Sequence, residues 1–257
     1  MSPQVTIFEL IEKDLEGATI VVGFPGAGLV GTIAANHLIN SQGLEQIGVI
    51  ESPHFPAVSV VKDGVPHNPV RIYAGEQTCI PEQVKGNDTC NQLVVCVSEF
   101  SPPAQLTKPL VTTLFEWIVE KGCKRLISAE GFRSADDDDI PDEVYGVGST
   151  EDARRGIEEG GVKPFMFGTI GGVSGVMLNE GKRRNFNMLS LLAEVKEDIP
   201  DARAAARVIQ VLDEKLLAIK LDPEPLLAEA KELEAQVRMM RDQAPPEASA
   251  ETPRYIG

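Results

Sequence analysis

The chain has 257 residues, of which 42% are hydrophobic and 25% charged, as expected for one large globular α/β domain with or without an appendage. Its formal net charge of −15 argues against nucleic acid and anionic membranes as partners, because both would repel it. The N-terminus lacks the features of a signal peptide, and no apolar run approaches the ~20 residues of a membrane span, so we expect a cytoplasmic protein.

Metal and disulfide chemistry have little support in the sequence. The three histidines are scattered, and none of the cysteines forms a C-x-x-C pair: Cys79, Cys90, Cys96 and Cys123. We therefore expect buried reduced thiols and no metal site. The run Asp136–Asp139 is interpreted as a solvent-exposed loop, because four adjacent acids rarely point at one cation.

Strand-like and helix-like segments alternate over most of the chain. The expected strands are Val5–Glu9, Thr19–Gly23, Gln46–Ile50, Val58–Val61, Val70–Tyr73, Leu93–Ser98, Arg125–Ala129, Glu143–Val147, Phe165–Thr169 and Met188–Leu192. The expected helices are Leu29–Ile39, Thr107–Lys121, Glu151–Glu159, Val173–Asn179, Asp201–Lys220 and Leu226–Arg241. A hairpin turn at Lys62–Val65 implies antiparallel pairing. Together these features predict an α/β fold, a three-layer sandwich with a mixed sheet.

The chain after Pro200 carries no strand signals. We therefore expect three parts in the sequence. Residues 1–200 form the α/β core, 201–241 a helical extension, and 242–257 a disordered tail rich in Pro, Ala and Glu. In the extension, apolar residues repeat with the 3.5-residue spacing of a coiled coil: Leu226, Ala230, Leu233, Val237 and Met240. Two interpretations stay open, an oligomer contact and a helix that packs on its own domain.

The tail ends in Arg254-Tyr255-Ile256-Gly257, which places an aromatic and an aliphatic residue at the end of a polar tether. Fourteen coil residues reach on the order of 20 Å. That reach would put Tyr255, Ile256 and Gly257 into a pocket on another molecule, so we interpret them as a partner-binding segment.

A glycine-rich turn lies between the strand ending at Gly23 and the helix beginning at Leu29. Gly26, Gly28 and Gly31 match the G-x-G-x-x-G pattern of dinucleotide-binding proteins, and Glu51 follows the next apolar run, where a ribose-binding carboxylate would lie. The alternative is a tight structural turn that lets helix approach sheet. We favour the structural role and expect no cofactor.

A second glycine-rich segment, Gly168–Arg184, includes Gly171, Gly172 and Gly175. It matches neither a phosphate-binding loop nor a nucleophile elbow. Its later residues Asn179, Glu180 and Arg183 would either line a polar pocket or cap a helix and pair with one another. With no nucleophile–base arrangement visible, the sequence predicts no catalytic residues and a protein that is not an enzyme.

Several segments together resemble the archaeal branch of the proteasome assembly chaperone family. They are Gly23–Gly31, Val144–Val147, Gly172–Gly175 with Leu178–Gly181, and the helix beginning Asp201–Ala206. The resemblance spans roughly residues 5 to 240. It implies a fold similar to nucleoside phosphorylases with a helical extension, and a non-enzymatic chaperone that forms homo-oligomers and helps assemble proteasome α subunits.

The resemblance also implies a role for the C-terminus, since some members dock a hydrophobic–Tyr–any-residue tail between α subunits. Here Tyr255 is third from the end and follows Arg254. The first hypothesis is therefore an oligomeric chaperone or adaptor whose partners are proteasome α subunits or the core particle. The alternative is a nucleotide- or nucleoside-binding enzyme that uses the Gly26–Gly31 turn or the Gly171–Gly175 loop. A third is a family member with another partner.

Overall fold

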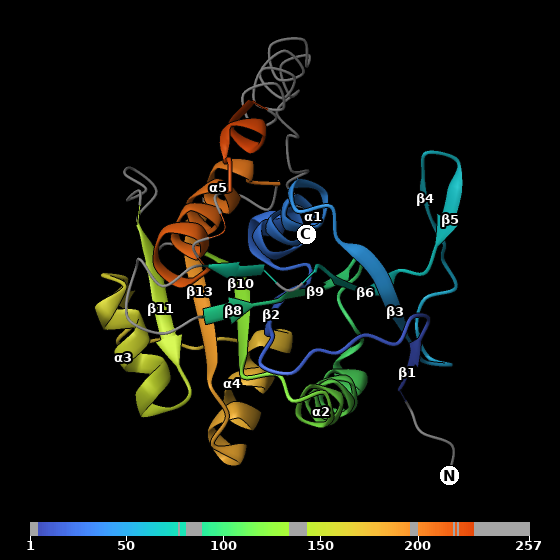
Figure 1. Cartoon of the computed structure of the whole chain (residues 1–257), viewed down its shortest axis with the longest axis horizontal. Helices are drawn as coiled ribbons and strands as arrows, with labels where there is room; N and C mark the ends of the chain where they lie inside the picture. Colours follow the sequence, from blue (N-terminus) through green and yellow to red (C-terminus); the bar gives the residue numbers. More distant parts are fainter. Residues whose placement is uncertain are drawn as a thin grey trace, which may run out of the picture.

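The computed structural model describes residues 5–76, 78–80, 89–133, 143–195, 200–217, 219 and 221–228. A nine-stranded mixed sheet runs through the centre, with helices on both faces (Figure 1). In order across the sheet its strands are β1 (Thr6–Glu9), β3 (Glu45–Glu51), β6 (Val70–Ala74), β9 (Leu93–Ser98), β2 (Thr19–Gly23), β10 (Arg125–Arg133), β13 (Met188–Val195), β11 (Val144–Gly148) and β12 (Lys163–Pro164).

The middle of the sheet is parallel, and an antiparallel pair adjoins it on each side. Strands β9, β2, β10 and β13 run parallel to one another, whereas β6 pairs antiparallel with β9 and β11 antiparallel with β13. Strands β2, β9 and β13 are buried along their length, as expected for strands covered on both faces. The predicted mixed sheet is confirmed.

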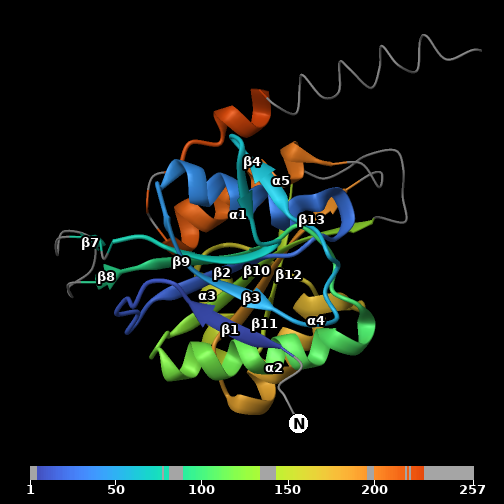
Figure 2. The same cartoon turned by 90° about the vertical axis from the view of Figure 1, so that its right-hand side faces the viewer.

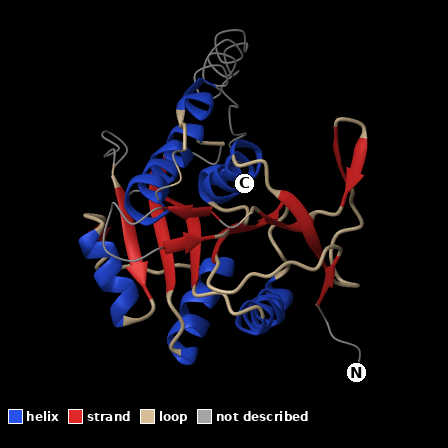
Figure 3. Ribbon diagram, in the orientation of Figure 1, coloured by secondary structure: helices blue, strands red, loops and turns tan. Residues whose placement is uncertain are grey.

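Two helical layers enclose the sheet, which is the predicted three-layer sandwich (Figures 1 and 3). On one face, α1 (Val30–Ser41) contacts α5 (Ala202–Val211), which continues into a helical turn at Leu212–Leu217. On the other face, α2 (Ala104–Glu120) contacts α4 (Gly172–Arg184). Helix α3 (Glu151–Glu159) packs beside β11.

Side chains of the central strands alternate between two hydrophobic cores. On β2, Val21 joins the core beneath α1 and α5, whereas Ile20 and Val22 join the core beneath α2. Strand β10 repeats this alternation with Ile127 and Leu126. Burial of both strand faces explains why these segments read as continuous apolar runs in the sequence.

A hairpin of β4 (Val60–Lys62) and β5 (Val65–His67) projects from the sheet beyond β3 (Figure 2). Its turn residues Asp63 and Gly64 have φ values of +53° and +78°, the left-handed conformation that two-residue hairpin turns require. The predicted hairpin is confirmed. A second pair, β7 (Thr78–Ile80) with β8 (Thr89–Asn91), was not predicted, because each strand has only three residues.

The clearest differences between the predicted elements and the structure concern one strand and one helix. The strand expected over Phe165–Thr169 is wrong, because only Lys163 and Pro164 pair with β11 before the chain turns away. The helix expected from Thr107 begins at Ala104, so Pro109 lies inside α2.

The segment after Pro200 begins within the core domain. Helix α5 buries Ala204, Ala205 and Val208 in the same cluster as α1, and Leu226 joins that cluster at 4% exposure. Ala230, Leu233, Val237, Met240 and the tail residues Tyr255, Ile256 and Gly257 lie outside the described residues, as does the run Asp136–Asp139. Within the described ranges, no helix is both long and apolar enough to cross a bilayer.

Candidate functional site

The first glycine turn lies where the parallel strands end, and its own chain fills it. Gly28 adopts φ +63°, and a Cβ there would come within 2.8 Å of the Val195 side chain and 3.1 Å of Asp201. The carbonyl of Gly28 also accepts a hydrogen bond from the Asp201 amide at 2.8 Å. Val195 at the end of β13 and Asp201 at the start of α5 therefore pack directly against Gly28.

Gly31 lets α1 approach the sheet. A Cβ at this position would lie 2.5 Å from the Ala129 carbonyl oxygen on β10, closer than any stable contact. Gly26, Gly28 and Gly31 therefore act as the structural turn that the sequence favoured.

The dinucleotide interpretation also fails in topology. In a dinucleotide fold the strand that ends in the ribose-binding acid neighbours the glycine-turn strand. Here β6 and β9 separate β3 from β2, so two strands lie between the strand of Glu51 and the strand of the turn. The Glu51 carboxylate instead accepts a hydrogen bond of 2.6 Å from the Asn68 amide.

The second glycine segment meets the first at Glu130, a residue that sequence reasoning missed. A Cβ on Gly26 would lie 3.1 Å from the Glu130 carboxylate, which in turn accepts a hydrogen bond from Ser174 in the first turn of α4. Burial raises the pKa of Glu130 to about 7, and the Ser174 hydrogen bond only partly opposes this shift. The one sequence signal was a lone acid within the apolar strand Ala129–Phe132.

The other glycines of the second segment start α4. Gly171 is the N-cap residue with no side-chain cap, Gly172 has φ +60°, and a Cβ on Gly175 would lie 2.1 Å from the Ile170 carbonyl oxygen. These glycines therefore set the sharp entry of the chain into the helix.

Asn179, Glu180 and Arg183 lie further along α4. Glu180 is buried and accepts hydrogen bonds from Arg183 Nε at 3.2 Å and from Arg184 Nε at 3.1 Å. The Arg183 and Arg184 hydrogen bonds hold the pKa of Glu180 below its usual value, although burial opposes them. Asn179 and Arg183 are exposed, and the Glu180 carboxylate forms an ion pair with Arg183 of the same helix.

A surface loop next to this region presents apolar side chains. Phe165 anchors it through edge-to-face contacts with Phe132 and Tyr145, at ring-centroid distances of 5.6 and 6.4 Å. The next two residues, Met166 and Phe167, are 70% and 90% exposed. The sequence placed these residues in a strand, so it did not reveal this surface.

The described cysteine side chains agree with the prediction of reduced thiols. Cys96 and Cys123 are buried and free, and burial raises the pKa of each to about 12. Among the described residues, no three His, Cys, Asp or Glu side chains come together as metal ligands.

Within this α/β sandwich, the protein's own atoms crowd Gly26, Gly28 and Gly31 of the first glycine turn. The chain belongs to the PAC2 family, whose model matches residues 20–241. This membership confirms the family resemblance seen in the sequence and agrees with the prediction of a protein that is not an enzyme.

Solved structures resemble the whole described fold. PbaA from Pyrococcus furiosus, an archaeal homologue of proteasome-assembly chaperone, is 31% identical, with 93% of this chain and 97% of that chain covered and a TM-score of 0.76. PbaB from the same organism, an archaeal proteasome activator, is 24% identical, with 93% and 99% covered and a TM-score of 0.76. An uncharacterised protein of Methanocaldococcus jannaschii is 26% identical over 246 residues, 93% of each chain.

Proposed function

We propose that this chain is a non-enzymatic, oligomeric cytoplasmic chaperone or adaptor that binds proteasome α subunits or the core particle and assists assembly. The observation that carries the proposal is the 31% identity to PbaA over nearly the full length of both chains, together with membership of the PAC2 family. Similarity at this level extends through both cores and the helices that cover them.

The Met166–Phe167 loop supports a protein partner. Large apolar side chains at a contact dominate binding energy when a rigid scaffold presents them. Phe165 fixes the base of this loop in the aromatic cluster, while Phe167 is 90% exposed. The loop therefore offers an anchored apolar contact at low entropic cost.

The C-terminal segment Tyr255, Ile256 and Gly257 is the proposed second contact. Several copies of a tethered tail on one oligomer would engage a ring with high effective concentration. Ala230, Leu233, Val237 and Met240 are the proposed oligomer contacts, since they share one face at coiled-coil spacing. Leu226 contributes less, because it is buried against its own domain.

The test is light scattering on a sizing column, with the protein alone and mixed with archaeal-type α subunits or with core particle. We expect an oligomer that shifts with either partner and loses most of the shift when residues 255–257 are deleted. Thr252→Ala is the matched control, because it alters the tail without touching the terminal segment. An oligomer that ignores both partners would overturn the proposal.

A further inference from the structure

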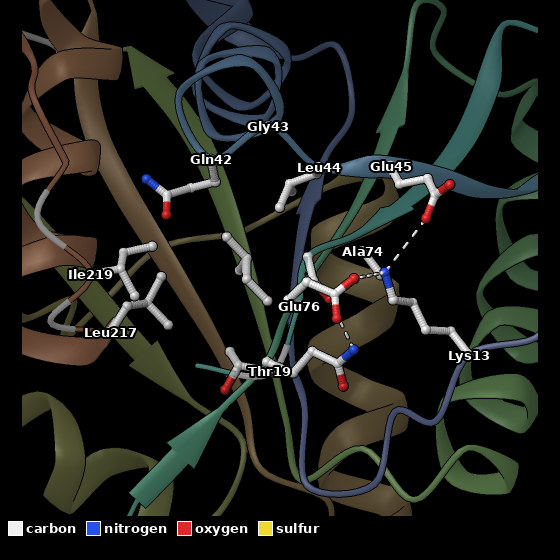
Figure 4. A pocket seen from close by; sticks show the side chains of 13 residues that line it. Lys13, Thr19, Gln42, Gly43, Leu44, Glu45, Ala74, Glu76, Leu217 and Ile219 are labelled. Atoms are coloured by element: carbon white, nitrogen blue, oxygen red, sulfur yellow. Dashed lines mark hydrogen bonds and ion pairs between the residues drawn. The ribbon is translucent and has the colours of Figure 1, made fainter. Parts of the chain in front are cut away.

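A pocket of about 220 Å³ opens at the opposite end of the sheet from the glycine turns (Figure 4). Thr19 at the start of β2 and Gln42 at the end of α1 belong to its lining. Its volume is below the ~300 Å³ at which pockets for small molecules begin. It therefore suits one large side chain of a peptide rather than a cofactor.

The two sides of the pocket differ in chemistry. Leu217 and Ile219 form one wall, and the polar side chains Lys13, Glu45 and Glu76 lie across from them (Figure 4). The pocket therefore accepts an apolar or aromatic group only against the Leu217–Ile219 wall.

The polar side carries an excess of negative charge. The Lys13 ammonium is 3.1 Å from the Glu76 carboxylate and 3.6 Å from that of Glu45, so one cation faces two anions. The side chains of Glu45 and Glu76 are 58% and 91% exposed and border the open rim. A fitting ligand combines a cationic group with an adjacent aromatic or aliphatic group.

This chain ends in such a sequence. Arg254 is followed by Tyr255 and Ile256, and it is the last charged side chain of a protein whose net charge is −15. We propose that the pocket holds the C-terminal segment Arg254–Gly257 of the same chain, with Arg254 at the acidic rim and Tyr255 against the Leu217–Ile219 wall.

The length of the chain allows this return. Leu217 and Ile219 line the pocket and precede Ala228, the last described residue, by eleven and nine positions. If the helix expected over 226–241 carries the chain about 24 Å away, the next sixteen residues can span up to about 53 Å when extended. The terminal residues therefore reach the pocket with slack.

Occupancy of the pocket would compete with the docking of the same residues on a partner. The tail would be held on its own domain in the free protein and released when a partner binds it more tightly. Such a contact lowers the apparent affinity for the partner by the fraction of time the tail is docked.

Photo-crosslinking of the full-length protein tests this placement. A p-benzoylphenylalanine replaces Tyr255, and crosslinked peptides are mapped by mass spectrometry in dilute protein without any proteasome component. We expect most crosslinks at residues 42–45, 74–76 and 217–219, with a yield independent of protein concentration.

Charge reversal sharpens the test. Glu76→Arg or Arg254→Glu should each reduce the pocket crosslinks at least threefold, and the two together should restore them. Glu158→Arg, on the exposed face of α3, is the matched control and should leave the yield unchanged. Crosslinks elsewhere, crosslinks that appear only at high concentration, or a yield insensitive to both reversals would each overturn the proposal.

The outcome is independent of the proposed chaperone role. Because the sample contains no partner, a negative result leaves tail docking on the proteasome intact. Conversely, a protein that ignores the proteasome can still hold its own tail.

Discussion

The two ends of the central sheet carry glycines for different reasons. At the carboxyl end of β2, a side chain on Gly31 would meet backbone at 2.5 Å, and one on Gly28 would meet Val195 at 2.8 Å. At the other end, nothing lies within 4 Å of a Cβ on Gly43, which borders the pocket, and its φ of +56° is what favours glycine there. The end that looks like a ligand site in the sequence is closed, and the open space lies at the end that carries no motif.

Gly31→Ala is expected to have the largest effect on stability. Its added methyl group would collide with the Ala129 carbonyl, and such overpacking costs about 2–3 kcal/mol because backbone must move. Urea denaturation measures the loss. Gly156→Ala in α3 is the control, because nothing lies within 4 Å of its Cβ, and it should gain up to about 1 kcal/mol. Equal behaviour of the two variants would contradict a closed turn.

Glu130→Gln tests the centre of the closed end. The folded-state pKa of Glu130 is raised to about 7 from 4.5, so the folded protein binds the proton more tightly than the unfolded chain. The stability linked to this group is therefore present below pH 4.5 and lost as pH rises through 7. The difference in unfolding free energy between the glutamine variant and wild type should therefore shift in favour of the variant between pH 4.5 and pH 8. The expected shift is on the order of 2–3 kcal/mol.

The control for this pH profile is Glu158→Gln, an exposed carboxylate on α3. It should leave the difference from wild type nearly constant between the two pH values. A constant difference for Glu130→Gln as well would show that Glu130 is not desolvated between the two glycine segments.

Glu180→Gln, on α4, tests a carboxylate whose pKa is shifted in the opposite direction from that of Glu130. Hydrogen bonds from Arg183 and Arg184 lower the folded-state pKa of Glu180, so its stabilisation is present above the unfolded value and lost as pH falls. We expect a loss of about 1–2 kcal/mol at pH 7 that shrinks toward pH 3, measured by thermal unfolding. A loss that stays constant with pH would indicate that packing, not charge, explains the effect.

Glu76→Gln should have the smallest effect, at the open end. Its side chain is 91% exposed, and an exposed ion pair with Lys13 contributes about 0–1 kcal/mol. We expect a change within about 0.5 kcal/mol in urea denaturation. A loss above 2 kcal/mol would mean that the pocket rim is part of the folded core rather than an open surface.

The central sheet was predictable because its strands are buried on both faces. Thr19–Gly23 and Leu93–Ser98 are continuous apolar runs, and both match the observed bounds. Helix α3 was also predicted with its observed bounds, since Thr150 caps it and glycine follows it. Three-residue strands such as β7 are too short to show such a pattern.

Strand order and the pocket could not be read from the sequence. The interpretation of Glu51 assumed that β3 neighbours β2, but chain order does not reveal that β6 and β9 insert between them. The pocket brings Lys13, Gln42, Glu76 and Leu217 together from distant parts of the chain, with no local motif. Glu130 was missed because one acid in a strand is uninformative until its neighbours are known.

The central claim is that this PAC2-family protein assists proteasome assembly without catalysing a reaction. The most direct measurement is the rate at which purified archaeal-type α and β subunits form peptidase-active core particles, with and without the protein. We predict a higher rate or yield with the wild-type protein and a loss of that gain when residues 255–257 are deleted. An unchanged rate and yield, at concentrations where the protein is a stable oligomer, would contradict the account.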